Sequence, residues 1–132
     1  MIEDYFQSLL QVIAASPSAR TPDIAFEKRS PAIGHIRGNI YFKDDSLLHF
    51  RELVNLRLGD RPTVYVYHYQ RADHSLVFRY DNSNHFPHLP GFPHHKHVND
   101  ETNVVSAVAP DLVTVLDEIE LLIAVTRSTT NS

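Results

Sequence analysis

Hydrophobic residues recur every three or four positions at both ends of the chain, which is the pattern of an amphipathic helix. In the first segment they are Ile2, Tyr5, Phe6, Leu9, Leu10 and Ile13. In the last segment they are Leu112, Val115, Leu116, Ile119, Leu122 and Ile123. Pro17 stops the first pattern, and Pro110 is suited to the first turn of the second. We therefore expect one helix at each end, with its apolar stripe packed on a sheet.

Between these helices the hydrophobic period shortens to two, which is typical of strands. The predicted strands cover residues 33–42, 47–57, 63–70 and 75–82. Short polar segments join them in pairs, so consecutive strands should be antiparallel. Residues 23–28 are a candidate for a short edge strand. The pattern predicts an α+β fold, in which an antiparallel meander of four or more strands carries the N- and C-terminal helices packed on one face.

The length of 132 residues suits one hydrophobic core, and we expect a single domain over 1–132. Residues 83–103 are rich in proline and histidine and lack periodicity, which predicts a long loop. The polar tail at 127–132 is expected to fray. No apolar run reaches the roughly 20 residues that span a bilayer, and the acidic start is unlike a signal peptide. The sequence thus predicts a cytoplasmic protein that does not enter the membrane.

Strand alternation also predicts which side chains share a sheet face. Burial of the apolar residues favours pairing Tyr67 with Phe78 in one hairpin and Ile40 with Phe50 in the other. Glu52 then falls on the apolar face, where it needs a partner or an edge position. The opposite face carries polar side chains, namely His35, Arg37, Asn39, Tyr41, His49, Arg51, His68, Arg79 and Asp81. Any solvated sheet face is polar, but arginine and histidine are suited to phosphate contact and proton transfer.

Composition narrows the chemistry. There is no cysteine, so disulfides, thiolate zinc sites and cysteine nucleophiles are excluded. The net charge of −4 by itself disfavours binding to nucleic acid. However, residues 20–80 carry ten basic and seven acidic side chains. Seven of the nine histidines fall between His68 and His97. This mildly basic middle of the chain and the histidine cluster next to it are where we expect function.

Three interpretations of the histidine-rich segment stay open. In the first, histidines such as His95 and His97, on one side of an extended segment, hold a metal ion that activates water. In the second, histidine, arginine, lysine and aspartate cleave RNA without metal, by supplying a base, an acid and a cation for the phosphorane. In the third, surface histidines on a proline-stiffened loop only cap the sheet. Their spacing does not separate these three.

Several short motifs resemble the TumE-like toxin family of prokaryotic toxin-antitoxin modules. They are Leu47-Leu48-His49-Phe50-Arg51-Glu52, Tyr67-His68-Tyr69-Gln70, Leu76-Val77-Phe78-Arg79-Tyr80-Asp81-Asn82, His85, and Phe92-Pro93-His94-His95-Lys96-His97-Val98. The resemblance covers about residues 30–125 and leaves out the arm at 21–31. It implies a small toxin that a DNA-binding antitoxin, encoded beside it, neutralises by binding. Its shared elements map onto His68, Arg79, Asp81, Asn82, His85, His94, His95, Lys96 and His97.

From the residues and the resemblance together, we expect a toxin that acts as a metal-independent ribonuclease, with no cofactor. The candidate catalytic residues are His68, Arg79, Asp81, His95, Lys96 and His97. The candidate binding residues are Arg37, His49, Arg51, Asn82, His85 and His94. The alternatives are a module that binds RNA or protein without chemistry, and a hydrolase with a histidine-held metal. Expected partners are the antitoxin and an RNA substrate, and an uncovered sheet edge would allow a homodimer.

Overall fold

The structure is a computed structural model that describes residues 1–130. It contains a helix at each end, α1 (Ile2–Ala14) and α2 (Leu112–Thr130), and seven strands between them. The strands are β1 (Asp23–Lys28), β2 (Ile33–Tyr41), β3 (Leu47–Asn55), β4 (Val64–Gln70), β5 (Leu76–Asp81), β6 (His95–Val98) and β7 (Asp100–Ser106). Neither helix is long and apolar enough, within this described part, to cross a membrane.

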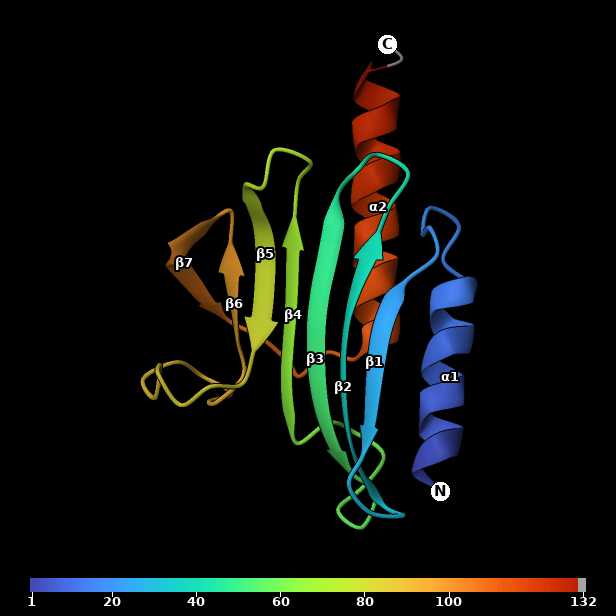
Figure 1. Ribbon diagram of the computed structural model, residues 1–132. Helices are drawn as coiled ribbons and strands as arrows, with labels where there is room; N and C mark the ends of the chain where they lie inside the picture. Colours follow the sequence, from blue (N-terminus) through green and yellow to red (C-terminus); the bar gives the residue numbers. More distant parts are fainter. Residues whose placement is uncertain (131–132) are drawn as a thin grey trace.

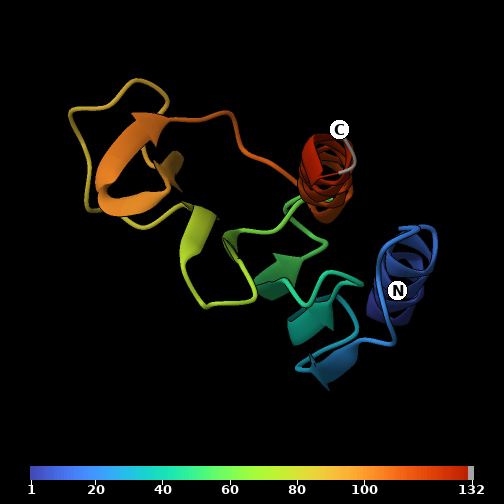
Figure 2. The ribbon, with the colours of Figure 1, turned by 90° about the horizontal axis from the view of Figure 1, so that it is seen from above.

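The strands form one antiparallel sheet in the order in which they follow along the chain (Figure 1). Both helices lie on the same side of the sheet (Figure 2) and contact each other. The predicted α+β meander with its terminal helices is therefore confirmed. The candidate edge strand at 23–28 is confirmed as β1, which pairs with β2.

The core lies between the helices and the inner face of the sheet, because the apolar stripes of both helices are buried there. In α1 the buried residues are Ile2, Phe6, Leu9 and Ile13. The helix packs closely on β2 at Gly34, where an added Cβ would lie 2.7 Å from Phe6 Cζ. A side chain at this position would push α1 off the sheet, so the missing Cβ of Gly34 lets the helix pack.

The predicted faces are right, but the predicted partners within both hairpins are wrong. Tyr67 pairs with Tyr80 rather than Phe78, and Ile40 pairs with Leu48 rather than Phe50. In the first hairpin the three-residue turn lies at 43–45, one residue earlier than predicted, and this shifts the register by two. In the second hairpin the turn covers three residues, 72–74, and is longer than the two-residue turn that the predicted pairing needs. A bulge at Tyr69/Gln70 contributes to the shift in the second hairpin. Since side chains alternate with period two, this shift leaves the polar residues on the face predicted for them. The exception is Val77, which strict alternation places on the polar side: it lies at the bulge and packs against the core on the helix side.

The predicted long loop at 83–103 is a larger error. Of these residues only 83–94 and Asn99 lie outside the strands, because β6 and the first part of β7 occupy the rest. The turn between them contains Asn99 in a left-handed conformation (φ 61°), which asparagine tolerates well. The predicted fray at 127–132 is wrong for residues 127–130, which continue α2, and residues 131–132 lie outside the described part.

Candidate functional site

The helix-free face of the sheet gathers most of the predicted site residues into two adjacent rows. One row of directly opposed residues runs Asn39, His49, His68, Arg79 and His97 across β2 to β6. The next row runs Arg37, Arg51, Val66, Asp81 and His95 across the same strands. Directly opposed residues have Cβ atoms about 5 Å apart, so each row is a continuous line of contacts. We call these two rows the polar face.

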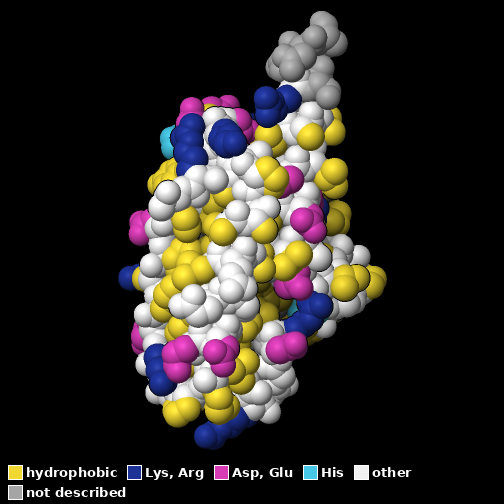
Figure 3. All heavy atoms as spheres, turned by 90° about the vertical axis from the view of Figure 1, so that its right-hand side faces the viewer, with side chains coloured by type: hydrophobic (Ala, Val, Ile, Leu, Met, Phe, Trp, Pro, Cys, Tyr) yellow, Lys and Arg dark blue, Asp and Glu magenta, His cyan; other side chains and the backbone are white. Residues whose placement is uncertain are grey.

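Two arginines on the polar face have no ion-pair or hydrogen-bond partner among the described residues. Arg37 and Arg51 are exposed and lie directly opposite each other on β2 and β3. Opposed like charges destabilise a sheet. By contrast, the side of the molecule that carries α1 shows basic and acidic side chains interspersed (Figure 3). An unpaired arginine pair of this kind is a suitable place for an anion.

The two histidines next to these arginines favour the neutral state. Burial lowers the pKa of His49, and the charges of Arg51 and Arg37 lower it further. Burial also lowers the pKa of His68, with a second contribution from Arg79. Nδ1 of His49 lies 2.9 Å from Oδ1 of Asn39. Because an amide oxygen only accepts, Nδ1 of His49 carries the proton and Nε2 is left with a free lone pair.

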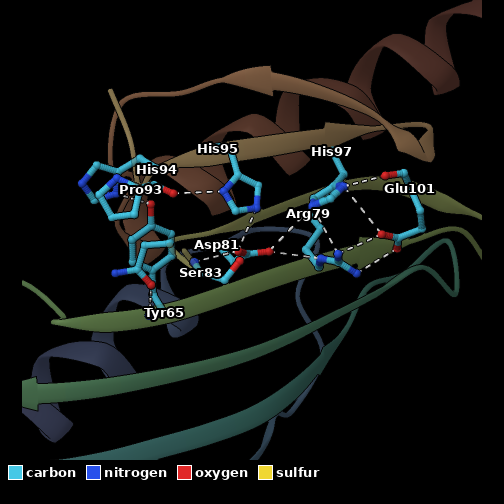
Figure 4. Close-up of polar contacts among 10 residues, drawn as sticks. Tyr65, Arg79, Asp81, Ser83, Pro93, His94, His95, His97 and Glu101 are labelled. Atoms are coloured by element: carbon cyan, nitrogen blue, oxygen red, sulfur yellow. Dashed lines mark hydrogen bonds and ion pairs between the residues drawn. The ribbon is translucent and has the colours of Figure 1, made fainter. Parts of the chain in front are cut away.

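A buried cluster of Asp81, His95 and His97 occupies the other end of the polar face, between β5 and β6 (Figure 4). Nε2 of His95 lies 2.9 Å from Oδ1 of Asp81, and Nε2 of His97 lies 3.8 Å from Oδ2. The opposite ring atoms, the two Nδ1 atoms, lie 3.0 Å from the carbonyl of Pro93 and 2.9 Å from that of Glu101. Both Nδ1 atoms therefore donate to backbone, and both Nε2 atoms face the carboxylate.

The environment of Asp81 keeps its side chain ionised. Burial alone would raise the pKa of this carboxyl, but hydrogen bonds from Ser83 and the charges of His95 and Arg79 lower it below the ordinary value. The backbone N–H of Ser83 donates to Oδ1 over 3.0 Å. The carboxylate is thus both charged and fixed in orientation.

Arg79 is held between two carboxylates. Its Nη1 and Nη2 each lie 2.8 Å from an oxygen of Glu101, and its Nε lies 3.3 Å from Oδ2 of Asp81. Nη2 also lies 3.2 Å from Nε2 of His97. Since every nitrogen of the guanidinium is engaged, Arg79 is less available to a phosphate than Arg37 and Arg51 are.

The segment 83–94 shapes the surroundings of the cluster. The ring of Phe86 covers both buried imidazoles, with centroids 4.7 Å from His95 and 5.8 Å from His97. Beside it lies a hollow of about 710 Å³, lined among others by Asp81, Asn82 and His85. Asp81 thus joins the buried cluster to a space that is open to solvent.

Four of the predicted site residues lie outside the two rows of the polar face. Lys96 points to the helix side, where its Nζ lies 2.7 Å from Oε2 of Glu118. His94 stacks on Tyr65 and bonds its hydroxyl over 2.8 Å. The side chain of Asn82 donates a hydrogen bond to the carbonyl of Thr63 and accepts one from the N–H of Tyr65. His85 is exposed on the rim of the hollow.

Two residues of this region were not predicted. Glu101 lies on β7, within the predicted loop at 83–103, so its contact with Arg79 of β5 was not predicted. Phe86 was seen only as part of a proline-rich segment. The alternation of His95, Lys96, His97 and Val98 was the available signal for a strand, and it would have brought Glu101 close to Arg79 through the turn that follows.

Comparison with known proteins identifies the family. The family model described as Toxin TumE matches residues 9–123, which includes the arm at 21–31 that the motif resemblance had left out. No match was found among curated proteins or among solved structures. The match covers most of the chain and all of the polar face. The chain therefore belongs to the TumE toxin family.

Proposed function

We propose that this toxin cleaves RNA at the polar face, by attack of the 2'-hydroxyl on the neighbouring phosphorus. The observation that carries the proposal is the placement of His49 directly opposite His68, next to the unpaired Arg37 and Arg51. This reaction needs a base, an acid and positive charge around the phosphate, and these side chains supply all three. It draws on no metal ion.

The tautomer of His49 fits the role of base. Its free Nε2 takes the proton of the 2'-hydroxyl, whose oxygen bonds to phosphorus. His68, in its protonated form, donates a proton to the 5'-oxygen as the P–O bond breaks. The products are a 2',3'-cyclic phosphate and a 5'-hydroxyl, and the two histidines have exchanged one proton through the substrate. Cleavage therefore requires one neutral and one protonated histidine.

The arginines divide into two groups in this scheme. Arg37 and Arg51 bind the phosphates, which relieves their mutual repulsion. Arg79 borders His68 directly across β4 and β5 and holds Asp81 and the buried histidines in place. Lys96, which the sequence suggested for phosphate contact, has no part because it binds Glu118 on the helix side.

Purified full-length toxin should cleave labelled RNA, also in the presence of a chelator, and leave a cyclic phosphate. A 2'-deoxynucleotide at the cleaved position should block the cut. We expect His49→Gln and His68→Gln to lower the rate by about 100-fold each, in the range of general acid-base catalysis. His88→Gln, at an exposed position in 83–94, is the matched control and should be fully active.

The pH profile gives an independent check. Because the pKa values of both His49 and His68 are lowered, the bell-shaped optimum should lie below their ordinary value of 6.5. The charged or titratable groups that bear on His68 are Arg79, Glu101 and His49. RNA that is retained but never cut would support the alternative, a binding module, and full activity of both glutamine variants would end the proposal.

A toxin of this family implies an antitoxin partner. We propose, from the resemblance of the motifs, that the partner is a DNA-binding protein encoded next to the toxin. Co-expression of the neighbouring reading frame with the tagged toxin, followed by co-purification and growth measurement, tests this. Growth that stays inhibited in the presence of a protein that does not co-purify would contradict it.

A further inference from the structure

Asp81, His95 and His97 form a compact group of buried side chains that the RNA chemistry above does not use directly. We propose that these three residues bind one divalent transition metal ion, of the class that prefers imidazole and carboxylate ligands, such as Zn²⁺. The proposal goes beyond RNA cleavage and does not depend on it. It stands on the positions of the ligand atoms, on their hydrogen bonds and on the charges around them.

The spacing of the ligand atoms fits a single ion. Each residue offers one ligand atom, and these atoms all lie within 4.8 Å of one another. Two ligands at the usual bond lengths of zinc, about 2.0–2.2 Å, lie roughly 3.4 Å apart in a tetrahedral site. The observed separations from the carboxylate, 2.9 Å for His95 and 3.8 Å for His97, lie on either side of this value. Seating the ion requires the three ligand atoms to move to a common separation of roughly 3.4 Å.

The contact between His95 and Asp81 is also unlike an ordinary hydrogen bond. Nε2 of His95 is completely buried and has no hydrogen-bond partner in the described part of the chain, although Oδ1 of Asp81 is only 2.9 Å away. The distance is short enough, so the alignment is what fails. Lone pairs that point to a shared position between two atoms, and not at each other, are the arrangement of metal ligands.

The outer hydrogen bonds prepare both imidazoles as ligands. Nδ1 of His95 and Nδ1 of His97 each donate to a backbone carbonyl, which leaves Nε2 unprotonated in the neutral ring. Metal-binding histidines almost always donate their other N–H to a carbonyl, carboxylate or water in this way. The N–H of Ser83 fixes the carboxylate of Asp81 in the same manner. All three ligands are thus oriented before an ion arrives.

Among the residues that the structure describes around the cluster, Arg79 is the group that opposes a cation, since it contacts both His97 and Asp81. Its two bonds to Glu101 are shorter and come from Nη1 and Nη2 together. When a metal binds, Arg79 gives up the contacts to His97 and Asp81 and stays paired with Glu101. The charges of Asp81 and Glu101 then offset much of the charge of the ion and of Arg79.

Three protein ligands leave one coordination position for water or an added ligand. Of the three, Asp81 also lines the hollow of about 710 Å³, so the open position is reached from there. Phe86 shields the imidazoles on the other side. His85 and His88 in the exposed segment 83–94 differ from this arrangement, because no acidic residue lies between them in the sequence.

The test is direct metal binding by the full chain, produced without a histidine tag and stripped with a chelator. We expect one equivalent of Zn²⁺ by calorimetry and elemental analysis, and a raised melting temperature with the ion. Bound Co²⁺ should show the intense visible absorption of a four-coordinate site. Asp81→Asn and His97→Gln should weaken binding at least 100-fold, while the matched controls His85→Gln and His88→Gln bind as the unchanged protein does.

One measurement on the unchanged protein guards against variants that do not fold. Ring-nitrogen NMR should show the Nε2 signals of His95 and His97 shifting on addition of Zn²⁺, while those of the exposed His74 stay in place. Absence of binding, or an Nε2 of His95 that carries a proton and ignores the ion, would overturn the proposal in favour of a simple ion pair with Asp81. Loss of binding in the loop variants alone would place the ion elsewhere and overturn it as well.

Discussion

Glu52 shows how a single carboxyl is accommodated in the apolar core. Its side chain is only 1 % exposed, and both its oxygens accept hydrogen bonds, from the hydroxyls of Tyr5 and Tyr67. Burial raises the pKa of Glu52 above its ordinary value, although the two hydroxyls act in the opposite direction. The group is therefore satisfied in its hydrogen bonds but still bears the cost of burying a charge.

Two substitutions separate these contributions. Glu52→Ala leaves two tyrosine hydroxyls without their acceptor and opens a void, so the free energy of unfolding should fall by about 2–4 kcal/mol. Glu52→Gln keeps the shape and carries no charge. The raised pKa of Glu52 favours the folded state below about 4.5, and this contribution to stability is lost as pH rises through the pKa of the folded state. The stability of the glutamine variant relative to the unchanged protein should therefore increase toward alkaline pH. Urea unfolding at several pH values measures the difference in the free energy of unfolding between the two proteins. A difference that does not vary with pH would contradict this account.

What the sequence disclosed about Glu52 illustrates the reach of strand alternation. Its place on the apolar face followed from the period of two, and so did its need for a partner. The identity of that partner could not be predicted, because Tyr5 lies 47 residues away on α1 and contacts Glu52 only through packing of the helix on the sheet. The same limit explains the hairpins: alternation predicted the face of the polar residues, while the position and length of the turns and a bulge decided the partners.

At the scale of elements, Lys96 links β6 to α2. Its Nζ bonds Glu118, and it lies 4.7 Å from the ring centre of Tyr80, whose hydroxyl donates to the same carboxylate over 2.6 Å. The motif resemblance had grouped Lys96 with His95 and His97 as a candidate for catalysis. In a strand, however, the middle residue of three points to the opposite face, so Lys96 belongs to the helix side.

This position predicts a separation of stability from activity. Lys96→Met should lower the free energy of unfolding by about 1 kcal/mol, because a partly buried, charge-assisted bond and a cation–π contact are lost. RNA cleavage, measured per folded molecule, should be unchanged. Lys43→Met, at an exposed position in a turn, is the control and should alter neither quantity. A folded Lys96→Met protein without cleavage activity would return Lys96 to the site.

The strands β6 and β7 were the elements that the sequence concealed. His95 and His97 alternate with Lys96 as in any strand, but the run is four residues long and is flanked by prolines and glycine. β7 is exposed at nearly every position, so no apolar period marks it. Its pairing comes from the hydrogen bonds of β6 and not from a buried face. The cluster of Asp81, His95 and His97 depends on this hairpin. The two histidines were therefore named from the sequence, whereas their geometry was not predicted.

At the scale of the whole molecule, the polar face determines how stability responds to acid. His49 and His68 lie on it, and His35 lies beside it on β2. Burial together with neighbouring arginines lowers the pKa of each of the three below 6.5. The unfolded chain then binds more protons than the folded one as pH falls through 6.5. Each histidine thus contributes stability that is complete above 6.5 and is lost on acidification toward its folded pKa.

A triple variant, His35→Gln, His49→Gln and His68→Gln, should therefore lose less stability between pH 7.5 and 5.5 than the unchanged protein does. Guanidinium unfolding at both pH values measures the difference, and the variant's folded state is verified by circular dichroism. His74→Gln, His85→Gln and His88→Gln, at exposed sites, form the matched triple control. Equal slopes for the two triple variants would show that acid acts elsewhere in the molecule.

The distribution of charge, more than its total, decides whether RNA binds. The net charge of −4 repels RNA at long range, so contact relies on local arginines within a screening length of about 10 Å. Arg37 and Arg51 are the unpaired cations of the polar face, and each phosphate that they neutralise releases counterions. For a single strand, the logarithm of affinity should fall with the logarithm of salt concentration with a slope of roughly 0.7 for each such contact.

Arg51→Ala should reduce this slope by about 0.7, the value for one contact. Arg20→Ala should leave the slope unchanged, because Arg20 is already paired with Asp45. Binding of a non-cleavable 2'-deoxy strand, titrated between low and moderate salt, measures both slopes, and an Arg51→Ala slope equal to that of the unchanged protein would remove the arginine pair from the RNA-binding surface.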